Sequence, residues 1–436
     1  MSTPPSDSPL SPADGEPPGP DLQAWLAHLE KNHPVEIELG LDRIAEVARR
    51  MALRPPAGKV VTVAGTNGKG SCVRTLEQLL LAAGLRVGAY SSPHLIRYNE
   101  RIRIQGVEVD DAALCRAFAL IDSARGEVSL TYFEVGTLAA LLLMAEADLD
   151  VAVLEVGLGG RFDAVNLVAA DIAVITAIDI DHSHWLGTTR EQIALEKAGI
   201  ARPGAEVVVA DENPPQTLVD HLDRLGCQAR YLGRDFSYHR EQGAMSVVLG
   251  GARGDAALAL AGLPLPALPL PSVVAAFQVA ALLGVALEPA FIAPLCAALA
   301  LPGRFQRVDY LGRRVILDVA HNPAAADYLC ARLRAAGEKR AAVVAAIMAD
   351  KDAEGFVTAL QPVASHWYLG ELATAPRALP AERLAAVVYT CGQRGSCPGD
   401  IGEAFAAAVG ATPPGGLVVV CGSFLTVAAI IEFMGV

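Results

Sequence analysis

The succession of a strand, a glycine-rich turn and a helix near residue 60 constrains this fold more than any other feature. The β-rich run Val60–Val63 is followed by Gly65-Thr66-Asn67-Gly68-Lys69-Gly70-Ser71, and a helical pattern then runs from Ser71 to Ala83. Such a succession directs backbone N–H groups and a helix dipole at a bound anion. We therefore predict a phosphate-binding loop, with Lys69 on a solvent-facing loop and the Ser71 hydroxyl within reach of Mg²⁺. The spacing departs from GxxxxGK(S/T), because two residues separate Gly65 from Gly68 and Gly70 precedes Ser71.

Short apolar runs alternate with helical patterns along the following residues. Strands are expected at Val87–Tyr90, Val151–Val156, Asp171–Ile178 and Glu206–Ala210, with helices around Asp111–Ser123, Glu134–Glu146 and Thr189–Gly199. Two amphipathic helices are expected before the first strand, one over residues 22–29 and one over residues 41–51. This alternation predicts buried parallel strands covered by helices.

A second alternation begins after the break Leu301-Pro302-Gly303. Its expected strands are Val315–Val319, Ala341–Ile347, His366–Leu369 and Leu417–Val420. The pattern predicts an α/β protein with a P-loop-type, mostly parallel sheet domain over residues 21–302 and a smaller, Rossmann-like α/β domain over residues 303–436. Two such domains create a cleft that can hold two substrates. The first 20 residues contain seven prolines, and we expect a disordered tail there.

The charge balance and the cysteine positions argue against several classes of protein. The 35 Lys and Arg against 48 Asp and Glu give a net charge of −13, which disfavours a nucleic acid as partner. The eight cysteines form no CxxC pair, so neither a zinc cage nor a disulfide framework is indicated. No Lys or Arg precedes Lys31, unlike a secretory signal, and prolines interrupt the uncharged stretch Leu263–Leu287. We expect a soluble, monomeric, cytoplasmic protein with no membrane partner.

Ionisable residues follow two of the expected strands. Glu155 ends one apolar run and Asp179–His184 follows another, and the carboxyl ends of parallel strands are where open α/β sheets bind ligands. Glu155 and His182 are therefore candidate metal ligands, although either residue could instead cap an element or stabilise a loop. Lys197 lies near the end of a helical pattern, where a lysine usually complements the helix dipole.

A series of motifs gives a more specific indication. From about residue 22 to the C-terminus, the chain resembles the bacterial dihydrofolate synthase/folylpolyglutamate synthases of the Mur ligase superfamily. The motifs that carry the resemblance are Gly65–Ser71, Ser91–Leu95, Thr131–Glu134, Leu154–Arg161, Asp181-His182, Glu196–Ile200, Gly303–Phe305, Asp318–Pro323 and Gly422–Phe424. The resemblance implies an ATP-dependent ligase that joins L-glutamate to dihydropteroate, and further glutamates to reduced folates, through an acyl phosphate.

The resemblance also implies roles for individual residues. It implies an ATP site formed by Thr66, Asn67, Gly68, Lys69, Gly70, Ser71, Ser272, Arg304 and Asp318. It implies Mg²⁺ ligands at Ser92, Glu155 and His182, with Ser71 at a second metal, and catalytic roles for Lys69, Lys197, Arg304 and His321. It implies a pteroate site formed by Ile37, Glu38, Leu39, Thr131, Tyr132, Phe133, Glu134, Phe162, Asp163 and Ala164.

Three positions qualify these implied roles. Lys197 resembles the lysine that this superfamily carbamylates, which turns a cation into an anion. Ser272 stands where the family usually has an adenine-contacting Asn, and a hydroxyl cannot offer the paired donor and acceptor of an amide. Glu38 stands where Asp is common in the segment Ile37–Arg43, whose presence favours dihydrofolate synthase activity over polyglutamylation alone.

Two other functions compete with this one. The first is a Mur-type ligase of peptidoglycan precursors, but those enzymes carry a UDP-binding domain before the phosphate loop, and here only about 60 residues precede Gly65. The second is a P-loop nucleotide-binding regulator without ligase activity. Glutamate-dependent phosphate release in the presence of dihydropteroate distinguishes the three hypotheses.

Overall fold

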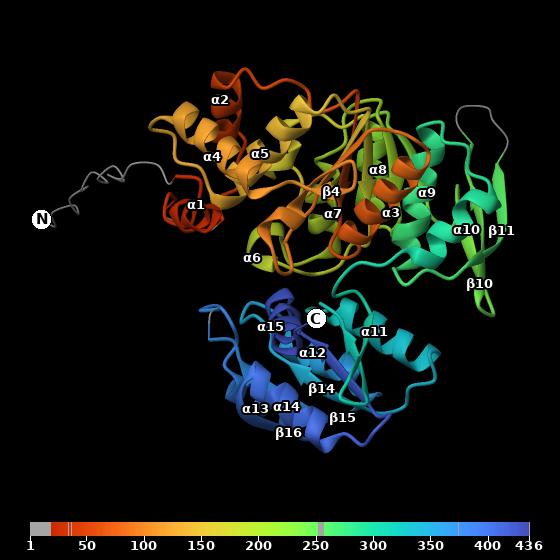
Figure 1. The fold of residues 1–436 in the computed structure, drawn as a ribbon. Coiled ribbons are helices and arrows are strands. Elements are labelled where there is room, and N and C mark those ends of the chain that lie inside the picture. Colours follow the sequence, from red (N-terminus) through yellow and green to blue (C-terminus); the bar gives the residue numbers. More distant parts are fainter. Residues whose placement is uncertain (1–18, 34, 36, 252–256, 374, 436) are drawn as a thin grey trace, which may run out of the picture.

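The computed structural model describes residues 19–33, 35, 37–251, 257–373 and 375–435. In it the chain forms two α/β units, which lie one above the other in Figure 1. The predicted disordered tail falls mostly on residues 1–18, outside the described residues. Gly19 and Pro20 are described, and their carbonyls accept hydrogen bonds from the Trp25 indole and the Cys115 thiol.

The larger unit is built on an eight-stranded sheet with the order β4-β3-β2-β5-β1-β6-β7-β8. Its strands are β1 (Lys59–Ala64), β2 (Val87–Tyr90), β3 (Ile102–Ile104), β4 (Val107–Glu108), β5 (Val151–Glu155), β6 (Ile172–Ile175), β7 (Glu206–Val209) and β8 (Gln228–Tyr231). The strands from β2 to β8 along this order run parallel, whereas β3 and β4 form an antiparallel edge.

Helices cover both faces of this sheet, because successive strand residues point to opposite sides. Val61 and Val63 pack with α3 (Lys69–Ala82) and α9 (Leu270–Leu282), and Val60 packs on the other face. The helices on that other face are α1 (Leu22–Leu29), α2 (Asp42–Arg50), α4 (Asp111–Arg125) and α5 (Tyr132–Glu146), while α7 (Arg190–Ala198) and α8 (Gln216–Arg224) pack against β6 and β7. Short helical turns η1 (Tyr98–Arg101), η2 (Ala164–Leu167) and α6 (Ser183–Leu186) complete the unit.

A small antiparallel sheet lies beside α9, and the sequence did not predict it. Its strands are β9 (Ser237–Glu241), β10 (Ala244–Leu249) and β11 (Leu258–Pro264), and α10 (Pro289–Ala298) packs against it. Every residue of β9 is partly or fully exposed, so this strand lacks the apolar alternation on which the prediction depended.

The smaller unit is a six-stranded sheet with the order β12-β13-β17-β14-β15-β16, parallel except for β12. Its strands are β12 (Gln306–Tyr310), β13 (Arg313–Leu317), β14 (Ala341–Ala345), β15 (Ala364–Glu371), β16 (Gly395–Asp400) and β17 (Leu417–Cys421). Its helices are α11 (Pro323–Ala335), α12 (Ala353–Leu360), α13 (Ala381–Thr390), α14 (Ile401–Ala411) and α15 (Phe424–Met434). A separate apolar cluster fills each face of this sheet.

The strand register brings the ends of central strands together in each sheet. In the larger sheet β1 lies between β5 and β6 and pairs Val63 with Glu155. In the smaller sheet β17 lies between β13 and β14 and pairs Leu317 with Val420. Because ligands of open α/β sheets bind where the strand order switches direction, the segments after these strands are the place to look for a site.

The α/β class and the two sheets confirm the sequence prediction, with differences at the ends of elements. Strand β6 is shorter than the expected Asp171–Ile178, because Thr176 turns toward the phosphate loop and its hydroxyl donates to the Asn67 carbonyl at 2.8 Å. Helix α3 begins at Lys69, two residues earlier than expected.

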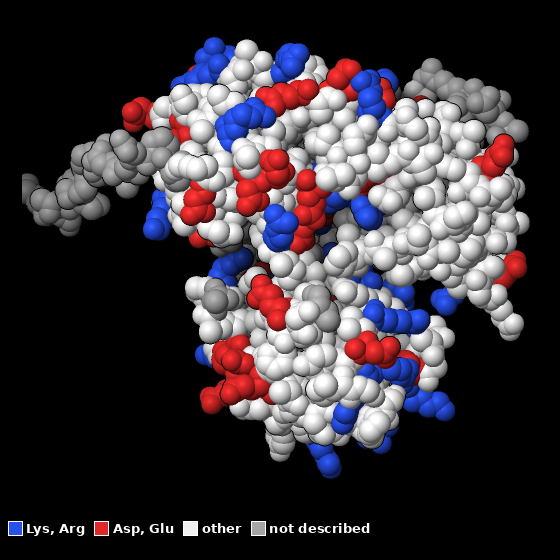
Figure 2. All heavy atoms as spheres, in the orientation of Figure 1, with Lys and Arg blue, Asp and Glu red and all other residues white. Residues whose placement is uncertain are grey.

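The face of the molecule seen in Figure 2 shows no division into acidic and basic units. Lys, Arg, Asp and Glu are interspersed over the visible face of both units in Figure 2. Among the described residues, no helix is long and apolar enough to cross a membrane.

Candidate active site between the two sheets

The loop after β1 has glycine where a side chain would collide with neighbouring residues. Gly68 has φ +90°, and a Cβ built on it would lie 2.3 Å from Ser272 Oγ at the start of α9. A Cβ on Gly65 would lie 1.7 Å from the Thr176 hydroxyl, which itself donates to the Asn67 carbonyl. The loop is thereby fixed between β6 and α9, and Ser272 touches it rather than standing apart from it. Thr66 completes the turn, donating through Oγ1 to the Asp179 carbonyl at 3.0 Å.

Lys69 is the first residue of α3, and the prediction that it lies on a solvent-facing loop is wrong. Its Nζ turns back and donates to the carbonyls of Gly65 at 3.0 Å and Thr66 at 3.3 Å. Burial lowers the pKa of this amine, while the carboxylates of Glu155 and Asp181 oppose that change. The ammonium group therefore closes the loop from inside, at the helix N-terminus where phosphate binds.

Two predicted metal ligands, Glu155 and Ser71, are buried at or near the start of α3. The Glu155 carboxylate is buried, accepts the Ser92 backbone N–H at 3.4 Å, and lies 3.4 Å from where a Cβ on Gly70 would be. The Ser71 hydroxyl is buried and has no hydrogen-bond partner. A buried carboxylate next to an unpartnered hydroxyl is an oxygen donor set of the kind that Mg²⁺ prefers, so these residues fit that ion.

Among the described residues, no hydrogen bond or ion pair links the His182 side chain to Glu155, Ser71 or Ser92. His182 Nε2 lies 3.4 Å from Lys351 Nζ and its Nδ1 lies 3.9 Å from the Asp350 carboxylate. Burial and the charge of Lys351 lower the pKa of His182 to about 4, although the charge of Asp181 opposes this change. With this lowered pKa the imidazole is neutral at neutral pH. Within the described residues, no three His, Cys, Asp or Glu side chains are grouped around one metal position.

Lys197 is a buried amine at the end of α7. The residue is 3% exposed, and its side chain forms no hydrogen bond or ion pair with the described residues. Burial and the charge of Lys69 lower its pKa to about 7, while Asp181 and Asp163 oppose the change. A helix-end lysine that only complements the dipole would lie at the surface with an ordinary pKa, so its position favours the chemical role.

Asp181 links the two units. Its carboxylate accepts Lys351 Nζ at 2.5 Å and Asn322 Nδ2 at 3.1 Å, and His321 Nε2 lies 3.5 Å away. Burial alone would raise the pKa of Asp181, but His321, His182 and Lys351 together hold it well below its usual range. Asn322 also exchanges hydrogen bonds with the Asn67 side chain of the phosphate loop at 3.1 Å.

The smaller unit contributes a second cationic group. Arg304 lies over the Phe424 ring, with Cζ 4.9 Å from its centroid, and the His321 ring is 6.5 Å from the same ring. Burial lowers the pKa of Arg304, while the charges of Asp318 and Glu155, one from each unit, oppose the change. The Asp318 carboxylate accepts the backbone N–H groups of Phe305 and Ala320.

The N-terminal segment predicted to bind pteroate contacts α5. Arg43 pairs with Glu38 and with Glu134, whose carboxylate is 3.1 Å from the guanidinium. Glu134 also forms a capping box with Thr131, accepting its backbone N–H at 2.8 Å. The structure thus brings Glu38, Thr131 and Glu134 together through Arg43, which the sequence analysis named only as the last residue of the segment Ile37–Arg43.

The remaining predicted pteroate residues flank the same region. Phe133 lies over Gly157, where a Cβ would be 2.6 Å from its ring, and the Phe162 carbonyl accepts the Gly40 N–H at 3.2 Å. Burial raises the pKa of Asp163 to about 6, although its carboxylate accepts the N–H groups of Leu158 and Val165. Ala164 is buried, Tyr132 packs edge-on against Tyr98, Leu39 is half-buried, and Ile37 lines the cleft described next.

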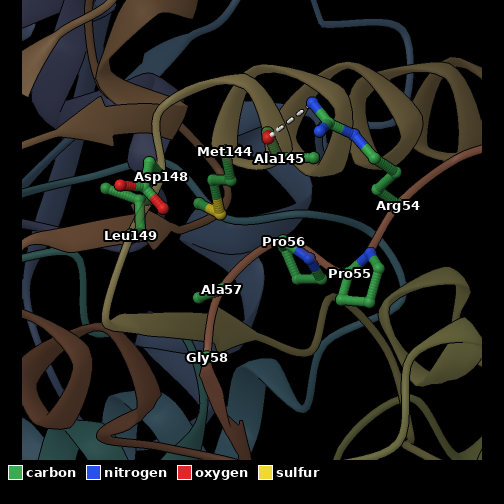
Figure 3. Close-up of a pocket in the computed structure, with 9 residues that line it drawn as sticks. All are labelled: Arg54, Pro55, Pro56, Ala57, Gly58, Met144, Ala145, Asp148 and Leu149. Atoms are coloured by element: carbon green, nitrogen blue, oxygen red, sulfur yellow. Dashed lines mark hydrogen bonds between the residues drawn. The ribbon is translucent and has the colours of Figure 1, made fainter.

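A cleft of about 540 Å³ opens where the two units meet. Its lining is mixed in character and includes Ile37, Ile180, Asp181, His182, Trp185, Asn322, Asp350, Lys351 and Arg377. A second hollow, lined by residues 54–58 and by Met144, Ala145, Asp148 and Leu149, lies at the start of β1 and β5 (Figure 3). That hollow is at the opposite end of the strands from the phosphate loop, so the cleft is the candidate active site.

Sequence reasoning missed the residues that bridge the units. Lys351 and Arg377 carry cations into the cleft, and Asp181 was recognised only as part of a motif. The run Asp350-Lys351-Asp352 shortly after the apolar strand β14 was the available signal, since charges at the carboxyl end of a parallel strand mark ligand sites.

The two units match two Mur ligase families. Residues 63–245 match the Mur ligase middle domain, and residues 303–424 match the Mur ligase glutamate ligase domain. The second match begins at Gly303, at the break that the sequence analysis placed between the domains.

Known relatives extend this match over nearly the whole chain. The dihydrofolate synthase/folylpolyglutamate synthase of Escherichia coli K12 is 42% identical over 412 residues, covering 94% of this chain and 95% of the relative. The structure of E. coli FolC in complex with DHPP and ADP has 44% identity and a TM-score of 0.87, covering 95% of this chain and 97% of that one. A bifunctional folylpolyglutamate synthase/dihydrofolate synthase with Mn, AMPPNP and L-glutamate bound has 42% identity and a TM-score of 0.87, covering 97% and 100%. The chain therefore belongs to the dihydrofolate synthase/folylpolyglutamate synthase family of Mur ligases.

Proposed function

We infer that this chain is an ATP-dependent amide ligase that joins L-glutamate to dihydropteroate and adds further glutamates to reduced folates. The observation that supports this conclusion most strongly is that residues of the two units contact one another at the candidate site. Lys351 and His321 of the smaller unit contact Asp181 of the larger one. Asn322 exchanges hydrogen bonds with Asn67 of the phosphate loop, and the charge of Glu155 acts on Arg304. Neither alternative function accounts for family membership over 94% of the chain.

The first step is transfer of the γ-phosphoryl group of ATP to the substrate carboxylate. A carboxylate is a poor acyl donor, and its conversion to an acyl phosphate supplies a leaving group. In this step the loop N–H groups, Lys69 and Arg304 neutralise charge on the phosphoryl oxygens, which is the main contribution a protein makes to such a transfer. Ser272 beside Gly68 and Asp318 beside Arg304 complete the nucleotide site.

The second step is attack of the glutamate amine on the acyl carbon, with release of phosphate. The protein holds the amine and the acyl phosphate together, which is worth far more than any covalent help. Ser92, Glu155 and His182 would hold the Mg²⁺, with Ser71 at a second metal. When bound, the ion neutralises phosphoryl charge.

The cleft between the units fits L-glutamate. This amino acid is a zwitterion with two carboxylates and one ammonium group, and the cleft offers Arg377 and Lys351 together with Asp350. We assign Arg377, which lines the cleft, to a substrate carboxylate. We place the pteroate beside L-glutamate, along Ile37, Phe162 and the start of α5. Ile37 belongs to the predicted pteroate site and also lines the cleft.

The domain boundaries follow the same division. We place the ATP- and pteroate-binding domain at residues 21–302 and the glutamate ligase domain at residues 303–436. Gly303, with φ +67°, supports this boundary, as does the family match that begins there. We further propose a cytoplasmic monomer.

A product assay tests the proposed function. Purified protein is incubated with MgATP, dihydropteroate and L-glutamate, and the products are separated, identified and quantified by mass spectrometry. We expect dihydrofolate and ADP in equal amounts, and no ADP when either dihydropteroate or L-glutamate is left out. ADP formed at the same rate without L-glutamate would indicate an ATPase or a regulator instead.

A further inference from the structure

A buried ion pair lies behind the metal-binding edge of the larger sheet. Glu77 on α3 is 1% exposed at its side chain, and Arg103 on the edge strand β3 is 11% exposed. Arg103 Nε donates to both carboxylate oxygens of Glu77, at 2.9 and 3.0 Å. None of the roles described so far uses this pair, although burying two charges costs several kcal/mol per ion unless they are well matched.

Arg103 reaches beyond Glu77 to the loop after β2. Its Nη1 donates to Ser91 Oγ at 3.1 Å and to the Glu100 carbonyl at 2.7 Å. The backbone N–H of the next residue, Ser92, donates to the Glu155 carboxylate at 3.4 Å. One guanidinium group therefore connects α3, which begins at the phosphate loop, to the loop that carries a proposed metal ligand.

A purely stabilising role does not explain this arrangement. Glu77 has a second cation in Arg74, whose Nη1 is 3.1 Å from the carboxylate and which is 29% exposed. Arg74 would already provide charge neutralisation from the same helix, one turn away. The additional contribution of Arg103 is geometric, because it joins Glu77 to Ser91 across two elements.

We propose that Arg103 is a positioning residue for the divalent cation: braced by Glu77, it fixes the Ser91-Ser92 loop against Glu155. This inference rests on the proposed function, because it takes Ser92 and Glu155 as metal ligands. Groups that orient ligands from behind typically change metal affinity ten- to a hundredfold when they are removed.

Mn²⁺ binding tests the proposal without relying on turnover. Electron paramagnetic resonance of free Mn²⁺ gives the affinity of the full-length protein in the presence of ADP, for wild type, Arg103→Met and Arg74→Met. We expect Arg103→Met to weaken Mn²⁺ binding at least tenfold, and Arg74→Met, which removes the other cation from Glu77, to change it less than twofold. Equal effects of the two substitutions would assign Arg103 a general stabilising role and overturn the proposal.

A second variant isolates the contact itself and covers the case in which Arg103→Met fails to fold. Ser91→Ala removes only the hydroxyl that Arg103 holds, and we expect it to weaken Mn²⁺ binding several-fold with an unchanged melting temperature. Combining Ser91→Ala with Arg103→Met should weaken binding no further than Arg103→Met alone, because both remove one connection. Normal Mn²⁺ affinity in Ser91→Ala would contradict the proposal, while product formation by the wild type tests the proposed function separately.

Discussion

Lys69, which is half-buried, and Lys197, which is buried, are two amines of the same site whose surroundings differ. Lys69 donates to two loop carbonyls at the N-terminus of α3, which is where an ammonium meets phosphate. Lys197 lacks such partners among the described residues, and burial together with the charge of Lys69 lowers its pKa to about 7. The first lysine is suited to bind an anion and the second to be chemically modified.

Substitution of Lys69 tests the phosphate site. Lys69→Met should lower kcat by roughly a thousandfold at saturating ATP, because a charge aimed at the phosphoryl group acts mainly in the transition state. The melting temperature should change little, since the lost hydrogen bonds join a side chain to nearby loop carbonyls. Steady-state kinetics and thermal unfolding measure the two quantities. A kcat close to that of the wild type would refute the role.

Lys197 is predicted to be carbamylated in the active enzyme. Only the neutral amine reacts with CO₂, and with a lowered pKa of about 7 the neutral fraction grows as the pH rises through 7. Carbon-13 NMR of protein equilibrated with labelled CO₂ should show a carbamate signal that increases from pH 6 to pH 8. Lys197→Ala should be nearly inactive and regain part of its rate with added acetate. An active enzyme with no carbamate signal would leave Lys197 as a helix-end residue.

At the scale of elements, the sequence predicts strand ends better than the contacts across the cleft. The apolar run before Glu155 was enough to place that carboxylate at the ligand-binding edge of the sheet. Asp181 and Lys351 lie 170 residues apart, and Asn67 and Asn322 lie 255 apart. Periodicity reports which face of an element is buried but not which element lies opposite, so these pairs required the structure. The exposed strand β9 was missed because it lacks an apolar alternation.

The contact between the loops after β6 and β14 should control turnover. Lys351→Met leaves the buried Asp181 carboxylate without its closest cation, a loss worth at least about 2 kcal/mol and thus roughly thirtyfold in kcat. Dihydropteroate affinity, measured by fluorescence titration, should stay within twofold, because the pteroate residues lie in the larger unit. Lys339→Met, at an exposed lysine of the same unit, is the matched control. Weakened dihydropteroate binding with a normal kcat would reverse this assignment.

The segment before α13 should determine the affinity for the amino acid. Arg377→Gln removes a cation from the cleft and should raise the KM for L-glutamate about tenfold or more, with the KM for ATP unchanged. Arg383→Gln, at an exposed arginine on α13 outside the cleft lining, should have no such effect. If the KM for L-glutamate rose equally in both variants, or in neither, the amino acid would have to bind elsewhere.

At the scale of the whole molecule, two sheets present their ligand-binding edges to each other. Each has its own apolar clusters, and hydrogen bonds and ion pairs join the two edges, beside the packing of Leu95 against the smaller unit. In the proposed function this division separates the tasks: the larger unit would bind nucleotide and pteroate, and the smaller one would supply cations to the reacting groups. The fold class and this division were predictable from two alternations of strands and helices, whereas the geometry of the cleft was not.

Transfer of oxygen from substrate to phosphate tests the central claim most directly. Dihydropteroate carrying ¹⁸O in both carboxylate oxygens is converted with MgATP and L-glutamate, and the released phosphate and the dihydrofolate are analysed by mass spectrometry. An acyl phosphate requires one ¹⁸O in each phosphate and one in the new amide carbonyl. Unlabelled phosphate formed together with dihydrofolate would show that ATP does not phosphorylate the carboxylate, and would contradict this account of the site.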